Sequence, residues 1–192
     1  MSELLSRGLA FAVIVGATWA SGAAHAADQP KFFDLSAPGH TEFSMLSKKN
    51  AGNNPNLAGC DGGNTSPALS WSGAPATTRS YAIELFDIVG NPPLGFVHWL
   101  AYDIPAAKTK LAEGEASKAS TEFKGGKNGA GSTLYFGPCP PPGGKPHPFT
   151  FLLMATDLAP GTLQPGMTRD ELSAALKGHI VDRTSLVLRY GN

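Results

Sequence analysis

The sequence predicts a mainly β protein built as a sandwich, and three observations carry that prediction. Several apolar segments are short, and they either alternate with the period of a strand or are apolar throughout. Glycine, proline or asparagine bounds most of them: the chain holds 23 glycines and 16 prolines in 192 residues, while 42% of it is hydrophobic. Only one segment carries clear helix signals. This combination is typical of a turn-rich, β-dominated globule.

Four segments are expected to form strands: residues 80–87, 98–104, 149–156 and 185–190. The first alternates, which places Tyr81, Ile83 and Leu85 on one face. The second is stopped by Pro105. The third reads FTFLLMAT and is almost continuously apolar, as expected of a strand that is covered on both faces.

One helix is expected, from Arg169 to Lys177. Thr168 and Glu171 form a capping box at its start, and Gly178 follows its last residue. Residues 106–132 contain many lysines and small residues without periodicity, so we expect a long exposed connection there.

The first 26 residues have the pattern of a secretory signal peptide. Arg7 precedes an apolar run of about 12 residues, and the segment ends in Ala24-His25-Ala26, an A-x-A cleavage pattern. The run is shorter than the roughly 20 residues that a membrane-spanning helix needs, although an uncleaved anchor is the alternative. We therefore expect a bacterial periplasmic or secreted protein, with residues 27–192 as a single domain and no transmembrane segment in the mature chain.

Composition and motifs exclude several classes of function. The formal net charge is +0, and the longest basic run is the pair Lys48-Lys49, so neither nucleic acid nor an anionic membrane is an expected partner. The sequence lacks G-x-S-x-G, H-E-x-x-H, Walker A and G-x-G-x-x-G motifs. We expect no enzyme activity and no cofactor.

The two cysteines, Cys60 and Cys139, are expected to form one disulfide, because an exported chain folds in an oxidising compartment. They lie 79 positions apart, and closing such a loop stabilises the fold by about 4 kcal/mol. The bond would bring two Gly/Pro-rich loops together. A Cys₂His₂ zinc centre that also uses His98 and His147 is the alternative.

Candidate ligand-binding residues lie where predicted strands meet loops. His98 and His147 stand at strand starts, where side chains often line pockets. Asp87 ends a strand and could accept a hydrogen bond from the His98 ring, or it could simply cap a turn. The loop of Gly137, Pro138 and Cys139 could direct the N–H of Cys139 at an anion, or it could be only a rigid surface loop.

Taken in order, these motifs resemble the phosphatidylethanolamine-binding protein family, in particular its bacterial Raf kinase inhibitor-like branch. The resemblance covers about residues 32–190, and the motifs that carry it are CDGGNTSPALSW from Cys60, the strand that ends at Asp87, His98-Trp99, GPCPP from Gly137, and His147. It implies a β-sandwich with one or two peripheral helices and a small pocket for phosphate-bearing or other anionic groups. It also implies that Asp87, His98, Gly137, Pro138 and His147 surround the pocket, and that the cysteines are paired.

Two departures from the family pattern change what the pocket is expected to hold. The family's D-P-D-A-P segment is replaced by a stretch in which Val89 stands in place of the second carboxylate. The family's H-R-Y becomes His147-Pro148-Phe149, which removes a basic side chain and a hydroxyl. Each lost hydrogen-bond partner costs about 0.5–1.5 kcal/mol, so a more apolar pocket with a different ligand is expected.

These observations favour an exported binding protein that holds a small anionic ligand or a phospholipid headgroup. Asp87 is expected to orient His98, while His147 and the loop at Gly137 complete the site. The alternatives are a regulatory protein that docks another protein at the pocket rim, as the inhibitor name of the branch implies, and a hydrolase with a histidine base. A homodimer is also considered.

Overall fold

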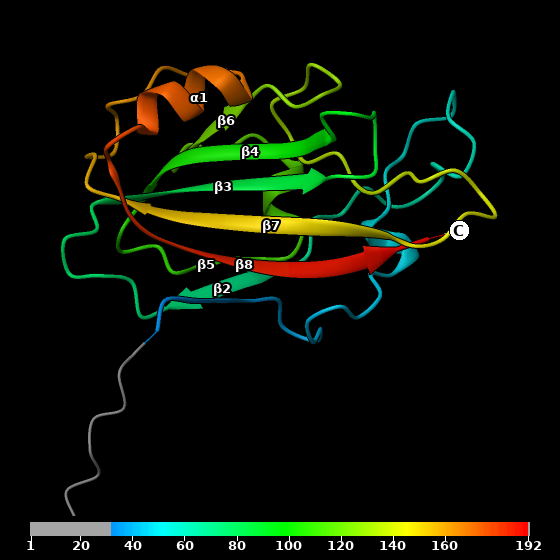
Figure 1. Cartoon of the computed structure of the whole chain (residues 1–192), viewed down its shortest axis with the longest axis horizontal. Helices are drawn as coiled ribbons and strands as arrows, with labels where there is room; N and C mark the ends of the chain where they lie inside the picture. The colour runs from blue at the N-terminus through cyan, green and yellow to red at the C-terminus, as the bar shows by residue number, and fades with distance from the viewer. Residues whose placement is uncertain (1–31, 192) are drawn as a thin grey trace, which may run out of the picture. The chain divides into compact units, whose positions relative to one another are not determined.

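The computed structural model describes residues 32–191, which form two antiparallel sheets and one α-helix (Figure 1). The predicted signal peptide and the first residues of the predicted mature domain lie outside the described residues. Within residues 32–191, no helix has the length and apolar character that a membrane crossing requires. The mainly β prediction is confirmed.

The larger sheet has five strands in the order β6-β4-β3-β7-β8. Their bounds are β6 Lys124–Gly126, β4 Phe96–Pro105, β3 Ser80–Asp87, β7 His147–Thr156 and β8 Ile180–Tyr190. The four strands predicted from the sequence are confirmed. Three of them begin earlier than expected, because pairing continues into segments without an apolar pattern, such as Pro148 opposite Arg189.

The smaller sheet has three short strands in the order β1-β2-β5, with bounds β1 Asp34–Ser36, β2 Leu69–Ser72 and β5 Lys110–Leu111. Its buried residues pack with those of the larger sheet into one apolar core. Leu35, Trp71 and Leu111 belong to the same cluster as Ile83 and Leu85 of β3. The alternation of β3 thus places one face of that strand in the sandwich core, as the sequence predicted.

The other face of the larger sheet is covered by helix α1, Arg169–Leu176. Leu172 and Leu176 of the helix pack with Leu100 and Met154 of the sheet in a second apolar cluster. The predicted capping box is present: the Glu171 N–H donates to Thr168 Oγ1 at 3.3 Å, and the Thr168 N–H donates to Glu171 Oε2 at 2.8 Å. The helix ends one residue before the predicted end, with Lys177 as its C-cap.

The prediction of a long exposed connection over residues 106–132 is wrong. This segment contributes β5, the short 3₁₀ helix η2 from Glu115 to Ser117, and β6. Leu111, Ala116 and Phe123 are buried in the sandwich core. These apolar residues are separated by runs of small and charged ones, so no periodic pattern marked them in the sequence.

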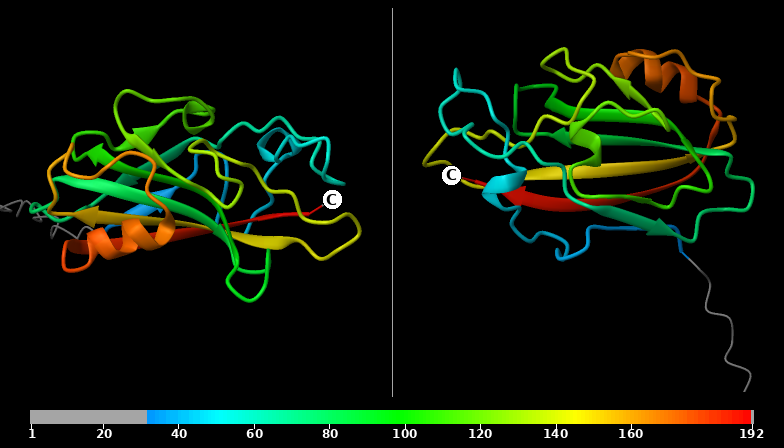
Figure 2. Two further views of the ribbon diagram at one scale, coloured as in Figure 1. Left: turned by 90° about the horizontal axis from the view of Figure 1, so that it is seen from above. Right: turned by 180° about the vertical axis from the view of Figure 1, so that it is seen from behind.

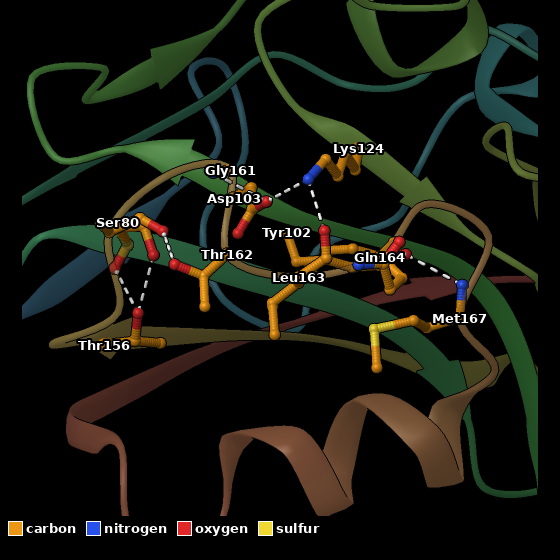
Figure 3. Close-up of polar contacts among 11 residues, drawn as sticks. Ser80, Tyr102, Asp103, Lys124, Thr156, Gly161, Thr162, Leu163, Gln164 and Met167 are labelled. Carbon is orange, nitrogen blue, oxygen red and sulfur yellow. Dashed lines mark hydrogen bonds and ion pairs between the residues drawn. The ribbon is translucent and has the colours of Figure 1, made fainter.

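A polar cluster around Asp103 fastens the segment before α1 to the larger sheet (Figure 3). Asp103 Oδ2 accepts hydrogen bonds from Lys124 Nζ at 2.7 Å and from the Gly161 N–H at 3.0 Å. Lys124 Nζ also donates to the Leu163 carbonyl. We call Asp103, Lys124, Gly161 and Leu163 the Asp103 clamp.

Candidate functional site

The antiparallel order of the larger sheet brings the predicted site residues to one end of it. Strand β3 ends where β4 and β7 begin, so that Asp87 is paired with Phe96 on one side and with Phe149 on the other. His98 lies in β4, and His147 is the first residue of β7. Asp87, His98 and His147 are therefore neighbours at the same sheet end, although they are far apart in the sequence.

A β-bulge places His98. The pairing of β3 with β4 shifts between Leu85, which is opposite Trp99, and Phe86, which is opposite Val97. His98 is thus the extra residue on β4. A bulge re-aims the side chain it carries, and bulges are common beside functional sites. This shift had no signal in the sequence.

Two loops close over this sheet end, and the Cys60–Cys139 disulfide joins them, as predicted. Figure 2 shows the loop near residue 60 and the loop near residue 140 together, close to the C-terminal end of the chain. The Gly52 N–H donates to the Pro138 carbonyl at 2.9 Å. A Cβ atom at Gly52 would lie 2.4 Å from the Cys139 sulfur, so only glycine allows the loops to approach this closely.

A cavity of about 240 Å³ opens between these loops and the strand ends. It is lined by Leu57, Asp87, Gly90, Asn91, Phe96, His98, Phe136, Cys139, Pro140, Pro141 and His147. Its size suits the headgroup of a ligand, because pockets for drug-sized molecules are about 300–1,000 Å³. Four of the predicted ligand-binding residues are on its wall: Asp87, His98, Cys139 and His147.

Gly137 and Pro138, the other two predicted residues, do not line the cavity but hold its wall in place. The Gly137 N–H donates to Asn64 Oδ1 at 2.8 Å, and the Pro138 carbonyl accepts from Gly52. A Cβ atom at Gly137 would lie 2.2 Å from the Asn50 carbonyl oxygen. These two residues therefore position the loop that carries Cys139.

Asp87 is paired with His147. The His147 Nδ1–H donates to Asp87 Oδ2 at 2.7 Å, and the Val89 N–H donates to Asp87 Oδ1 at 2.9 Å. The Asp87 side chain is 5% exposed and that of His147 is 16% exposed. The bond fixes the His147 ring and leaves its Nε2 as the nitrogen that can meet a ligand.

The expected pairing of Asp87 with His98 is wrong, because a backbone carbonyl takes the His98 proton. The His98 Nδ1–H donates to the Phe136 carbonyl oxygen at 2.8 Å. Burial lowers the pKa of His98, and this effect outweighs the opposing effects of the Phe136 hydrogen bond and of the Asp87 charge. The lowered pKa favours the neutral ring of His98, in which Nδ1 carries the proton and Nε2 is a hydrogen-bond acceptor.

Aromatic rings surround His98. Phe96 and Phe149 meet its ring edge to face, with centroids 4.8 Å and 5.1 Å away, and Phe136 is stacked on it at 5.8 Å. Phe149 is one of the departures from the family pattern, and it is fully buried here. Phe149 packs against His98 from behind and does not itself line the cavity, so the more apolar pocket expected from the departures stays a prediction.

Sequence reasoning did not identify the apolar lining. Phe96 and Phe136 each lie within two residues of a motif that was identified, and they could have been found by asking which side chains flank His98 and Gly137. Leu57 carried no signal, because only the folding of its loop brings it to the cavity.

The site has little to offer a metal ion. Both cysteine sulfurs are in the disulfide, which leaves no thiolate for the zinc centre considered from the sequence. Over the described residues, no group of three or more histidine, cysteine, aspartate or glutamate side chains could hold a metal ion.

Comparisons with known proteins identify the family of this chain. Residues 47–191 match the family described as phosphatidylethanolamine-binding protein. The UPF0098 protein YbcL of Escherichia coli is 40% identical over 101 residues, which are 50% of this chain and 55% of the relative. A UPF0098 protein of Methanothermobacter thermautotrophicus is 34% identical over 138 residues, 71% of this chain and 89% of the relative.

Two solved structures have the same fold. The crystal structure of E. coli YbcL, described as a new member of the mammalian PEBP family, has a TM-score of 0.75 at 27% identity, and it covers 83% of this chain and 98% of that one. The structure of CT736 from Chlamydia trachomatis, described as a putative PhosphatidylEthanolamine-Binding Protein homolog, has a TM-score of 0.72 at 26% identity, with 84% and 99% covered.

Proposed function

Since the chain belongs to the phosphatidylethanolamine-binding protein family, we propose that it is a binding protein that holds a small anionic or phosphate-bearing headgroup in the cavity between Asp87, His98 and His147. The observation that carries this proposal is the Asp87–His147 hydrogen bond in a cavity wall made mostly of apolar residues. The bond to Asp87 occupies Nδ1 of the His147 ring, so Nε2 is the ring nitrogen left to contact a ligand oxygen.

The same geometry favours binding over catalysis. The lining includes no serine or threonine hydroxyl among the described residues, and Cys139 is oxidised. The hydroxyl of Ser66 lies outside the lining and accepts a hydrogen bond from the Ala116 N–H at 3.1 Å. A histidine base without a hydroxyl or thiol nucleophile beside it supports ligand binding over nucleophilic catalysis.

We further propose that the protein acts in an oxidising compartment, the periplasm or the outside of the cell. The disulfide supports this location, because such bonds persist mainly in exported proteins. The signal-like pattern of residues 1–26 agrees with it. Fractionation of cells that carry the full chain, with mass analysis of the mature N-terminus, tests this proposal.

A second candidate function, docking of a protein at the cavity rim, is favoured by one observation. The loop after β3 exposes three large apolar side chains beside the cavity, Ile88, Val89 and Leu94. Exposed apolar residues that are close together often mark interaction surfaces. Cross-linking in periplasmic extract, and size-exclusion chromatography for a second copy of the chain, separate this candidate from ligand binding alone.

Calorimetric titration with phosphorylethanolamine, phosphate and acetate tests the main proposal. We expect saturable binding to the wild type and at least a tenfold loss in the double variant His98→Ala, His147→Ala. The control is His179→Ala, because His179 forms a similar pair with Asp157 at 2.8 Å but does not line the cavity. Equal titrations of the wild type and the double variant would remove the site assignment.

A further inference from the structure

Two asparagine side chains hold the segment that supplies the hydrogen-bond acceptor of His98. The His98 Nδ1–H donates to the Phe136 carbonyl at 2.8 Å, and the Phe136 N–H donates back to the His98 carbonyl at 3.1 Å. Residues 134–137 belong to no strand, so the ladder of a sheet does not fix this carbonyl. Asn128 holds the start of the segment, and Asn64 holds its end.

Asn128 uses all four hydrogen-bonding positions of its amide group. Its Nδ2 donates to the His98 carbonyl at 3.2 Å and to the Leu134 carbonyl at 2.9 Å. Its Oδ1 accepts from the Ala130 and Ser132 N–H groups, each at 3.0 Å. Because carbonyls only accept and backbone N–H groups only donate, the amide fits in one orientation. Asn128 is buried, and it ties β4 at His98 to the segment that follows.

Asn64 reaches the other end of the segment from the loop that carries Cys60. Its Oδ1 accepts from the Gly137 N–H at 2.8 Å, and its Nδ2 donates to the Tyr135 carbonyl at 3.1 Å. These two residues directly flank Phe136 in the chain. Asn64 has a φ of 49°, a backbone conformation that asparagine adopts more readily than most residues. The residue type thus suits both the turn and the amide contacts.

We propose that Asn64 and Asn128 are positioning residues that set which ring nitrogen of His98 carries the proton. They hold the Phe136 carbonyl at Nδ1, and a carbonyl accepts only from a protonated nitrogen. Nε2 is then the unprotonated nitrogen and the one left for the cavity. The consequence for a ligand rests on the proposed function, in which His98 is part of the binding wall.

The location of the proton matters because the His98 ring is buried. Burial lowers the pKa of His98, which favours the neutral ring with a single N–H. A neutral imidazole has two tautomers, and each presents the opposite hydrogen-bonding role at Nε2. When the Phe136 carbonyl is no longer held at the ring, nothing on the Nδ1 side selects one tautomer over the other.

¹⁵N NMR of the mature protein, labelled at histidine, tests the proposal, because protonated and unprotonated ring nitrogens give separate signals. A pH of about 8 is above the ordinary histidine pKa of about 6.5 and keeps the rings neutral. The signals of His98 are those that vanish in His98→Gln. We expect His98 of the wild type to carry its proton on Nδ1.

Two variants remove the amide donors and keep the acceptors. Asn128→Asp loses the donors to the His98 and Leu134 carbonyls, and Asn64→Asp loses the donor to the Tyr135 carbonyl. We expect either variant to lower the ratio of Nδ1–H to Nε2–H in His98 by about twofold to tenfold, and its affinity for phosphate by a similar factor.

Asn54→Asp is the matched control. It adds the same charge in the Cys60 loop, where Asn54 Oδ1 accepts from the Asn56 N–H at 3.0 Å, a role that aspartate retains. It should change neither the tautomer nor the affinity. An asparagine that only stabilised its loop would lower the free energy of unfolding when replaced, without changing the tautomer of His98 in the folded protein.

The inference and the proposed function fail on different results. A His98 tautomer that stays as in the wild type in folded Asn128→Asp and Asn64→Asp would overturn the inference and leave the proposed function standing. If Asn128→Asp does not fold, the half-buried Asn64 gives the decision alone. The tautomer is measured without a ligand. Failure of the wild type to bind phosphorylethanolamine, phosphate or acetate would therefore overturn the proposed function and not the assignment of the ring proton.

Discussion

Two buried aspartates lie at opposite ends of the larger sheet, on the neighbouring antiparallel strands β3 and β4, and they perform different tasks. Asp103, near the end of β4, is bonded to the Lys124 ammonium group and to the backbone of the segment before α1 (Figure 3). Asp87, at the end of β3, has the titratable His147 as its partner and a cavity beside it. Both carboxylates are almost inaccessible to solvent.

The difference lies in what the partner can still do. Lys124 donates both to Asp103 and to the Leu163 carbonyl, so its ammonium group joins three segments of chain and serves as structure. His147 uses one nitrogen on Asp87 and has a second one left. Of these two buried carboxylates, the one at the cavity is the one whose partner retains a second ring nitrogen.

The largest effect should come from breaking the disulfide that encloses the Asp87 end. Replacing both Cys60 and Cys139 with alanine should lower the free energy of unfolding by about 4 kcal/mol, because the unfolded chain regains the freedom of a 79-residue loop. Urea unfolding measures this, and phosphate titration should show weaker binding, since the wall at Cys139 is no longer held. A loss below about 1 kcal/mol would mean that the hydrogen bonds donated by the Gly52 and Gly137 N–H groups hold the two loops together without the disulfide.

Breaking the Asp103 clamp should cost nearly as much stability without affecting the cavity. Lys124→Met leaves the buried Asp103 charge without its cation, and we expect a loss of about 3 kcal/mol in urea unfolding with unchanged affinity for phosphate. His147→Gln is the matched variant at the other end, and it should show the reverse: a loss of about 1 kcal/mol or less in stability, but weaker binding. Equal effects of the two variants on binding would contradict the division of tasks.

Acid should lower the free energy of unfolding through His98, which lies at the same end of the sheet as Asp87. The folded-state pKa of His98 is lowered by burial, so below the ordinary histidine pKa of about 6.5 the unfolded chain binds a proton that the folded chain does not. The stability that His98 contributes is complete above that pH and is lost as the pH falls below it, by at most about 1.4 kcal/mol per pH unit. Unfolding measured from about pH 8 to 5 should show a smaller slope for His98→Gln than for the wild type.

The smallest effect should come from the helix cap beside the Asp103 clamp. Thr168→Ala removes the acceptor of the Glu171 N–H, and the variant should lose about 0.5–1 kcal/mol of stability, which thermal unfolding can measure. Binding of phosphate should be unchanged, because Thr168 does not line the cavity. A change in affinity would show that helix α1 and the Asp87 end are coupled.

Local signals in the sequence predicted much of the fold. Strands β3, β4, β7 and β8 have strong apolar patterns, and helix α1 has its capping box, so each was found. The strands β1, β2 and β5 are two to four residues long, which is too short for a pattern to appear. They form because the apolar face of the larger sheet is stable only when a second layer buries it, and these three strands make that layer.

The site could be predicted as a set of residues but not as a set of contacts. Asp87, His98, Cys139 and His147 were expected to be at the cavity, and they line it. The partner of Asp87 was not predictable, because both histidines stand near strand starts. The bulge re-aims His98, and the Phe136 carbonyl accepts its Nδ1–H. Asp87 is therefore paired with His147.

The sequence by itself determined the four long strands, the helix cap, the disulfide pair and the residue types at the cavity. Each of these follows from neighbouring residues, or from the fact that only two cysteines exist. The tertiary structure alone decided which histidine has its pKa lowered by burial and which one Asp87 holds. Hydrogen bonding and desolvation depend on groups more than 30 positions apart in the chain, and only the folded sheet brings these together.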